Sequence, residues 1–361
     1  MTITSQLRAK LLGGISLLPI SIAHRRLTLF LPVKLDQSSC PSISLVIPTR
    51  NRPVELRRCL DSVLCQTIKP QEVIIVDGGK LNPEELFPMF ADTGIELRII
   101  PKGTPGTAEA RNMGTSAARG ELIYFIDDDV VLSPSYIQEI AKIFVADRAK
   151  TIGGVQGKCL PNDNKTSPEG VLTTLFGINS PDRFGGAVWP NGFHKRVRNV
   201  PVPYLVEVFY GGATFRREAI LATPFDAINF PGYTKGEDTE QSYRLAHSCK
   251  LAYTPLAEYF DQPSQHGRPH PIKMTIQETY AAYKLIALND QLGLLNYLLV
   301  GWGLLGKQLF SIKHLISDKG QRQKYLSDLI GQGIGAITLP FAIPTRSAVA
   351  KFWVQWLAKV D

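Results

Sequence analysis

The chain has 361 residues, of which 44% are hydrophobic and 20% are charged, as expected for a globular protein with one large or two modest domains. This composition excludes a largely disordered chain. The net charge of +8 predicts an anionic partner, either a phosphorylated substrate or a lipid surface; the sequence has no long Lys/Arg block or nucleic-acid-binding motif, so nucleic acid is not expected.

The cysteines are odd in number, widely spaced and without a CxxC pair, which argues against a disulfide framework and against a zinc site. They fit a reducing compartment. They are Cys40, Cys59, Cys65, Cys159 and Cys249.

Residues 1–41 form a basic N-terminal extension with five Lys or Arg residues, a single acidic residue and an apolar run at residues 11–23. The pattern fits a signal peptide, or an interfacial anchor whose basic groups meet anionic lipid. We favour the anchor or a structural extension, because the chemistry argued below needs a cytosolic substrate.

From residue 43 the pattern alternates between short strands and helices. Strands are predicted at 42–48, 71–77, 96–100 and 122–126, and helices at 49–66, 82–92 and 107–120. Pro53 favours the start of the first helix, and Gly120 is expected to cap the last one. This rhythm predicts an α/β fold with a mostly parallel sheet. Ligands bind beyond the carboxyl ends of such strands, where Pro48, Thr49 and Asp77 lie.

The last of these strands runs into three consecutive carboxylates, Asp127, Asp128 and Asp129. Three like charges after a buried strand repel each other, and a divalent cation would relieve that repulsion. Mg²⁺ and Mn²⁺ prefer oxygen ligands and often bind a diphosphate at the same time. Taken alone, the triplet could also be a solvated acidic turn.

Five segments in register resemble the family 2 glycosyltransferases of the GT-A fold. The segments are VIPTRNRPVELRRCLDSVLCQ, EVIIVDGG, ARNMGTSAARGELIYFIDDDV, GGATFRRE and KGEDTEQSYR. The resemblance implies a catalytic domain at residues 42–270 with a Rossmann-like, mixed but mostly parallel sheet flanked by helices. It also implies a nucleotide-diphosphate sugar donor and a glycan or lipid-linked acceptor.

On the donor side, the resemblance assigns two groups of residues. Those that would hold the nucleoside are Pro48, Thr49, Arg50 and Asp77. Arg111 would face the diphosphate, and Asp127 and Asp129 form the D-x-D motif that contacts the ribose and a Mg²⁺ or Mn²⁺ ion. Asp128 belongs to the same donor-side group, although strand alternation points it away and favours a structural role. Many family members also have a histidine ligand after a later strand, and His266 or Asp261 stands there in this chain.

On the acceptor side, the resemblance places Gly211 and Gly212 beside the donor sugar and the acceptor. Asp238 would be the general base that deprotonates the acceptor hydroxyl, and Glu237 would support it. The competing interpretation is that both carboxylates only favour the start of a helix. A base opposite a metal-bound leaving group implies a single inverting displacement.

Residues 271–361 are predicted to be helical, with uncharged stretches at 291–306 and in the 329–345 region. Both are at or below the length that crosses a bilayer. They form either interfacial helices or a helical subdomain packed on the core. Trp302, Trp353 and Trp356 favour a membrane surface. We therefore predict a cytoplasmic protein, peripheral at the inner face of the cytoplasmic membrane.

The sequence thus predicts a metal-dependent glycosyltransferase of cell-surface polysaccharide or glycolipid synthesis. A nucleotidyltransferase of similar fold is the first alternative, but it should have a Gly-rich loop where this chain has PTRNRP. A non-catalytic sugar- or lipid-binding relative is the second.

Overall fold

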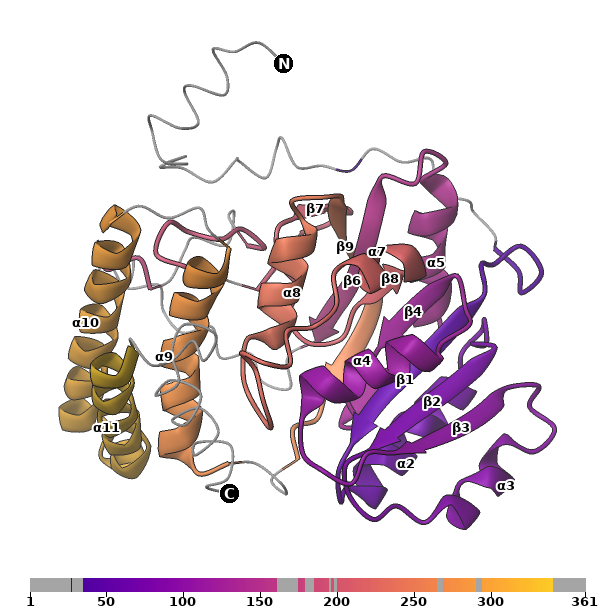
Figure 1. Cartoon of the computed structure of the whole chain (residues 1–361), viewed down its shortest axis with the longest axis horizontal. Coiled ribbons are helices and arrows are strands. Elements are labelled where there is room, and N and C mark those ends of the chain that lie inside the picture. Colours follow the sequence, from indigo (N-terminus) through magenta and orange to yellow (C-terminus); the bar gives the residue numbers. More distant parts are fainter. Residues whose placement is uncertain are drawn as a thin grey trace, which may run out of the picture.

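The computed structural model describes residues 27, 35–160, 175–178, 185–194, 196–197, 200–264, 269–289 and 294–339 (Figure 1). The predicted ligand His266, most of the N-terminal extension and Trp353 and Trp356 lie outside the described residues. The predicted domain boundaries stay predictions.

A single mixed sheet of nine strands organises the fold, in the order β3-β2-β1-β4-β8-β6-β9-β5, with β7 paired to β9. The strands are β1 (Ile43–Thr49), β2 (Glu72–Asp77), β3 (Glu96–Pro101), β4 (Leu122–Phe125), β5 (Val130–Leu132), β6 (Ile152–Leu160), β7 (Tyr204–Val206), β8 (Thr214–Arg216) and β9 (Lys250–Asp261). Strands β1 to β4 pair in parallel, as predicted from their alternation with helices. The joins of β4 to β8 and of β8 to β6 are antiparallel.

The described helices flank this sheet, and the C-terminal ones pack beside it at one end. They are α2 (Pro53–Leu64), α3 (Phe87–Phe90), α4 (Thr107–Ala117), α5 (Tyr136–Ala146), α7 (Arg217–Ala222), α8 (Glu237–Leu245), α9 (Pro271–Leu288), α10 (Leu294–Ser317) and α11 (Arg322–Thr338). Pro53 is the first residue of α2, where a missing N–H costs nothing. The weak helix predicted at 82–92 is a 3₁₀ turn, Pro83–Glu85, followed by the short α3.

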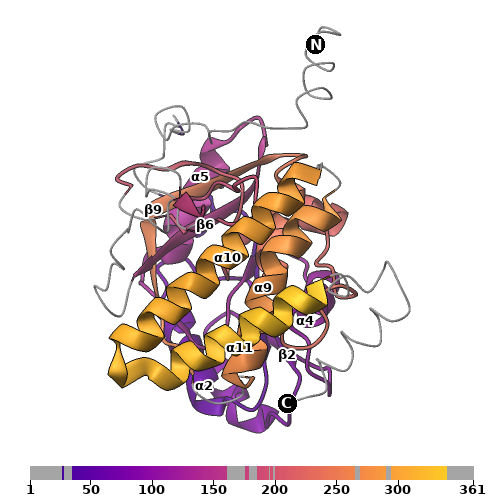
Figure 2. The same ribbon diagram turned by 90° about the vertical axis from the view of Figure 1, so that its left-hand side faces the viewer.

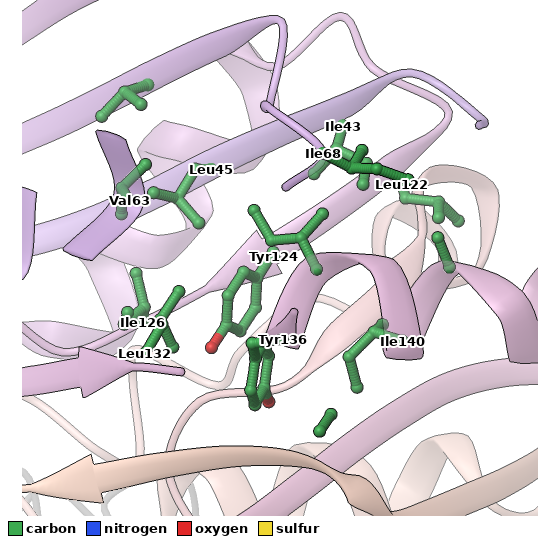
Figure 3. Packing of buried hydrophobic residues seen from close by; sticks show 14 of the residues in the cluster. Ile43, Leu45, Val63, Ile68, Leu122, Tyr124, Ile126, Leu132, Tyr136 and Ile140 are labelled. Atoms are coloured by element: carbon green, nitrogen blue, oxygen red, sulfur yellow. The ribbon is translucent and has the colours of Figure 1, made fainter. Parts of the chain in front are cut away.

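Alternation along the strands builds one apolar layer on each face of the sheet. On one face, Ile43, Leu45 and Ile47 pack in a cluster with residues of α2 and α5. On the other, residues of the central strands pack with α4, α7 and α8. Figure 3 shows the first layer, where the rings of Tyr124 and Tyr136 stack with their centroids 5.3 Å apart. Because both faces of the sheet are covered by apolar side chains, the strands are held in place, and so are the polar residues at their ends.

The predicted capping role of Gly120 is wrong. Helix α4 ends at Ala117 and is capped by Ala118. Gly120 lies instead against β1: its N–H donates to Ser44 Oγ at 2.8 Å, and a Cβ at this position would lie 2.7 Å from the Ser44 nitrogen. A close backbone approach therefore explains this glycine.

The C-terminal helices pack together beside the sheet, as Figures 1 and 2 show. Helix α9 contacts α8 on one side and α10 and α11 on the other. Within the described part of the chain, none of the helices combines the length and apolarity that a membrane crossing requires.

Candidate active site

The ends of β1 and β2 place Thr49 and Asp77 side by side, because these residues are partners in the parallel register. The Asp77 carboxylate accepts hydrogen bonds from the N–H groups of Gly79 and Leu81, both at 2.8 Å. This is the turn-capping geometry of an aspartate. Pro48 lies one residue earlier in β1, and Arg50 is exposed just beyond the strand. The nucleoside-binding role of all four residues stays a prediction.

The acidic triplet forms the turn between β4 and β5, and its first two carboxylates have different surroundings. Asp127 is the most open of the three, with a side chain 41% exposed, and it pairs with Arg111 Nη2 at 2.9 Å. Asp128 is buried; it accepts hydrogen bonds from Thr49 Oγ1 at 2.7 Å and from Arg52 Nη1 at 3.0 Å. Burial raises the pKa of Asp128 to about 6. Asp128 thus contacts Thr49 at the end of β1 and Arg52 just before α2, and its predicted donor-side role stays a prediction.

Asp129 faces the last part of β9. Its Oδ2 accepts the N–H of Ser264 at 3.2 Å, and its carbonyl accepts the N–H of Gln262 at 3.0 Å. Burial, and next the negative charge of Asp127, raise the pKa of Asp129, and Asp261 adds to the effect. Asp261 is the register partner of Val130, the residue after Asp129. Three carboxylates therefore repel each other here.

This repulsion is the observation that bears on a metal. Carboxylate oxygens suit Mg²⁺ and Mn²⁺, which complete their shell with water and substrate phosphates. The described residues contain no group of three or more His, Cys, Asp or Glu side chains already arranged as a metal site. The carboxylates of Asp127, Asp129 and Asp261 suit such a cation, and the metal-binding roles of Asp127 and Asp129 stay predictions.

Arg111 links the triplet to the second acidic motif. It is buried on α4, and its guanidinium bridges Asp127 at 2.9 Å and Glu237 Oε1 at 3.1 Å. The Phe225 ring lies 5.2 Å from the Cζ atom. Arg111 therefore positions two carboxylates from opposite sides of the site, and its predicted contact with the diphosphate stays a prediction.

Arg52 is a site residue that the sequence did not single out. Its Nη1 lies 3.0 Å from Asp128 and 3.7 Å from Asp129. The TRNRP segment contained the signal, since it has two arginines after β1. Pattern alone could not tell that Arg52, rather than Arg50, faces the triplet.

Glu237 and Asp238 occupy the first turn of α8, after Gly236 in a left-handed conformation. Glu237 is buried, and this burial, followed by the adjacent Asp238 charge, raises its pKa to about 7. Asp238 is half-buried and accepts the N–H of Gly211. The two members of the motif therefore differ in how easily a substrate can reach them.

Gly211 and Gly212 bring this motif next to the triplet. Gly211 has φ +78°, and a Cβ there would lie 3.9 Å from Asp127 Oδ2; at Gly212 it would lie 2.5 Å from the Phe125 carbonyl oxygen. The close approach to β4 leaves no room for a side chain at Gly212, and the positive φ favours glycine at position 211. The predicted metal-side and base-side residues thus meet at one segment.

The chain also matches the model of a known protein family. The family model "Glycosyl transferase family 2" matches residues 44–222. The chain contains a family 2 glycosyltransferase domain. The predicted family is confirmed, and the mixed sheet with its flanking helices and C-terminal helices confirms the predicted GT-A fold.

Relatives of the family 2 domain have named activities. The chain is 33% identical to the chondroitin synthase of Pasteurella multocida over 211 residues, 58% of this chain and 20% of that protein. It is 27% identical to the validoxylamine A glucosyltransferase of Streptomyces hygroscopicus subsp. limoneus over 259 residues, 66% of this chain and 55% of that protein. The match thus spans from a fifth to just over half of these relatives.

A solved structure shares the fold of the family 2 domain. The mannosyltransferase PcManGT of Pyrobaculum calidifontis, in complex with GDP-Man and Mn²⁺, aligns with a TM-score of 0.51 and 15% identity. The alignment covers 86% of this chain and 90% of that chain.

Proposed function

We propose that this chain transfers a sugar from a nucleotide-diphosphate sugar to a hydroxyl acceptor, with inversion, in the synthesis of a cell-surface polysaccharide or glycolipid. The observation that carries the proposal is the meeting of Asp127 and Asp238 at Gly211. A leaving group on the Asp127 side and a base on the Asp238 side are what one direct displacement requires. Such a displacement needs no nucleophilic residue of the chain and forms no covalent intermediate with it.

Asp238 is the general base in this proposal. It is half-buried at the start of α8, whereas Glu237 is buried against Arg111. An acceptor hydroxyl can therefore approach Asp238. Glu237 and Arg111 hold the base-bearing turn in register with the donor side.

Asp129, with Asp127 and Asp261 beside it, would hold Mg²⁺ or Mn²⁺, and His266 is a further candidate ligand. A bound divalent cation supplies charge neutralisation for the departing diphosphate. Pro48, Thr49, Arg50 and Asp77 would hold the nucleoside at the ends of β1 and β2. Asp128 fixes Arg52 and Thr49 beneath this donor site.

The test measures nucleotide-sugar turnover with Mn²⁺ or Mg²⁺ across a panel of donors. We expect Asp238→Asn and Asp129→Ala each to lower turnover at least about a hundredfold, as for loss of a general base or a metal ligand. Asp61→Asn, an exposed aspartate of α2, is the matched control. The proposal fails if both site variants turn over donors like the wild type. Release of a sugar 1-phosphate in place of a nucleoside diphosphate would indicate nucleotidyl transfer.

We further infer that the enzyme works on a membrane surface through α10 and α11. Large apolar side chains follow one another at alternating spacings of three and four along the exposed side of α10, and α11 adds more. They are Leu295, Leu298, Trp302, Leu305, Leu309, Ile312 and Ile316 on α10, and Leu326, Ile330, Ile334 and Ile337 on α11.

Exposed cations accompany this apolar surface, namely Lys313, Arg322 and Lys324. Apolar and basic groups together are typical of helices that lie in the interface of an anionic bilayer. We expect the double variant Leu298→Glu, Ile316→Glu to lose co-sedimentation with vesicles of anionic lipid. Leu221→Glu, at an exposed leucine of α7, should bind as the wild type does. Equal binding of all three proteins would refute the attachment.

A further inference from the structure

Tyr210, next to the segment that holds the base, is surrounded by groups that the roles above do not use. Its backbone is fixed by Gln156, which donates from Nε2 to the Tyr210 carbonyl at 2.9 Å and accepts the Tyr210 N–H at 3.3 Å. Its hydroxyl is buried and has no hydrogen-bond partner among the described residues. The N–H of the next residue, Gly211, donates to Asp238, so Tyr210 lies beside the proposed base.

A short turn places His194 on this ring. The bridge between Val188 and His194 closes the turn, and Gly192, with φ +72°, docks so closely against α9 that a Cβ would lie 2.3 Å from the Ala282 carbonyl oxygen. The His194 and Tyr210 ring centroids are 5.2 Å apart. His194 Nδ1 lies 2.9 Å from the Gly192 carbonyl oxygen.

His194 is suited to accept a hydrogen bond from a substrate. Burial lowers its pKa, which favours the neutral ring. With the Nδ1 proton donated to a carbonyl, Nε2 carries the lone pair. Among the described residues Nε2 has no hydrogen-bond partner. A second hydroxyl of the acceptor could therefore donate to His194 Nε2 while the reacting hydroxyl donates to Asp238, since each hydroxyl has only one proton to donate.

Two cations lie beside the aromatic rings of Tyr210 and Phe193. The guanidinium carbon of exposed Arg196 lies 5.7 Å from the Tyr210 centroid, and Lys307 Nζ of α10 lies 4.6 Å from the ring of Phe193, the residue before His194. Neither cation forms an ion pair with a described residue, although Asp261 and Asp238 attract Arg196 over a longer distance. On the donor side, by contrast, Arg52 and Arg111 are each paired with a carboxylate.

Lys307 has no carboxylate in direct contact among the described residues. Burial lowers its pKa, and Glu278, which is paired with Lys235, and Asp328 offset this effect only from a distance. A partly buried cation without a counter-ion favours an anionic ligand, because the ligand offsets the cost of desolvation.

We propose that the wall formed by His194, Arg196 and Lys307 is an acceptor subsite that binds a hydroxyl compound carrying a negative charge, a sugar carboxylate or a phosphate, next to the hydroxyl that reacts. This inference rests on the proposed function, and it adds the chemical class of the acceptor. Arg196 and Lys307 compensate the anion, and His194 accepts a hydrogen bond from a neighbouring hydroxyl, which orients the acceptor so that its reacting hydroxyl faces Asp238.

The test separates acceptor binding from turnover. Calorimetry measures the affinity of the intact protein for three disaccharides of equal size, ending in glucuronic acid, in glucose 6-phosphate or in glucose. We expect one or both anionic probes to bind at least about tenfold more tightly than the neutral one, the size expected for one charge-assisted contact. The preferred anion tells carboxylate from phosphate.

The variants assign the preference to these residues. Arg196→Gln and Lys307→Gln should each remove about tenfold of the charge preference, leaving donor hydrolysis and binding of the neutral probe unchanged. Arg57→Gln, an exposed cation of α2, is the control. The inference is overturned if the wild type does not prefer anions, if neutral and anionic probes weaken alike, or if Arg196→Gln impairs donor hydrolysis. Failure of donor turnover in the wild type would instead count against the proposed function.

Discussion

Replacing Glu237 by glutamine gives a direct test of the electrostatic structure of the site. The wild-type carboxyl is buried beside Asp238, and its pKa is raised from 4.5 to about 7. Glutamine has nearly the same shape and stays neutral at every pH. The variant should therefore behave like the wild type with Glu237 permanently protonated.

The expected magnitude follows from linkage. The folded state keeps the Glu237 proton up to about pH 7, whereas the unfolded chain releases it near 4.5. Unfolding thus releases a proton in this window, and wild-type stability falls as the pH rises through it, by about 3 kcal/mol in total. Above pH 7 both states are ionised and this contribution is constant. Glu237→Gln escapes the loss, so it should be more stable than the wild type by up to about 3 kcal/mol at pH 8 and nearly equal to it near pH 4.5.

Urea unfolding in EDTA at pH 5 and pH 8 measures the difference. Glu240→Gln is the matched control on the same helix, because the Glu240 carboxylate accepts a hydrogen bond from Arg244 Nε at 2.9 Å. Losing that pair should give no gain at pH 8. If Glu237→Gln is no more stable than the wild type at pH 8, or gains equally at both pH values, the reasoning about the buried carboxyl is wrong.

Two further predictions concern the neighbouring contacts. Ser264→Ala removes the hydrogen bond from the Ser264 hydroxyl to Glu55 Oε1 at 2.6 Å. This bond holds the segment whose backbone N–H donates to Asp129. Mn²⁺ affinity, measured by electron paramagnetic resonance titration, should weaken about tenfold, as for other residues that orient metal ligands. An unchanged affinity would contradict the assignment of Asp129 to the metal. Gly212→Ala places a Cβ 2.5 Å from a β4 carbonyl oxygen, and should lower the unfolding free energy by roughly 1–3 kcal/mol; a wild-type urea midpoint would show that the two segments can separate freely.

The first four strands were predictable because local pattern determines them. Alternating apolar residues place each strand, and the polar residues that end it then fall at one edge of a parallel sheet. Gly120 shows the limit of this reasoning. A glycine after a helix is usually a cap, and only the approach of β1 to its backbone reveals the other reason for a missing side chain.

The acceptor wall illustrates a second limit. His194, Arg196 and Lys307 belong to no motif, and their role depends on a turn docked against α9 and on a helix more than a hundred residues further along the chain. Sequence pattern reports on neighbours in the chain, and these contacts join residues that are distant in it.

The sequence by itself determined the α/β order and the family and predicted a set of site carboxylates, since each depends on short segments whose residue types carry the chemistry. Only the tertiary structure decided how those carboxylates are shared: Asp127 with Arg111, Asp128 with Arg52, and Asp129 with the end of β9. Three identical side chains in a row have the same intrinsic chemistry. They differ here because burial and the charges brought to them by distant segments set the energy of each one separately.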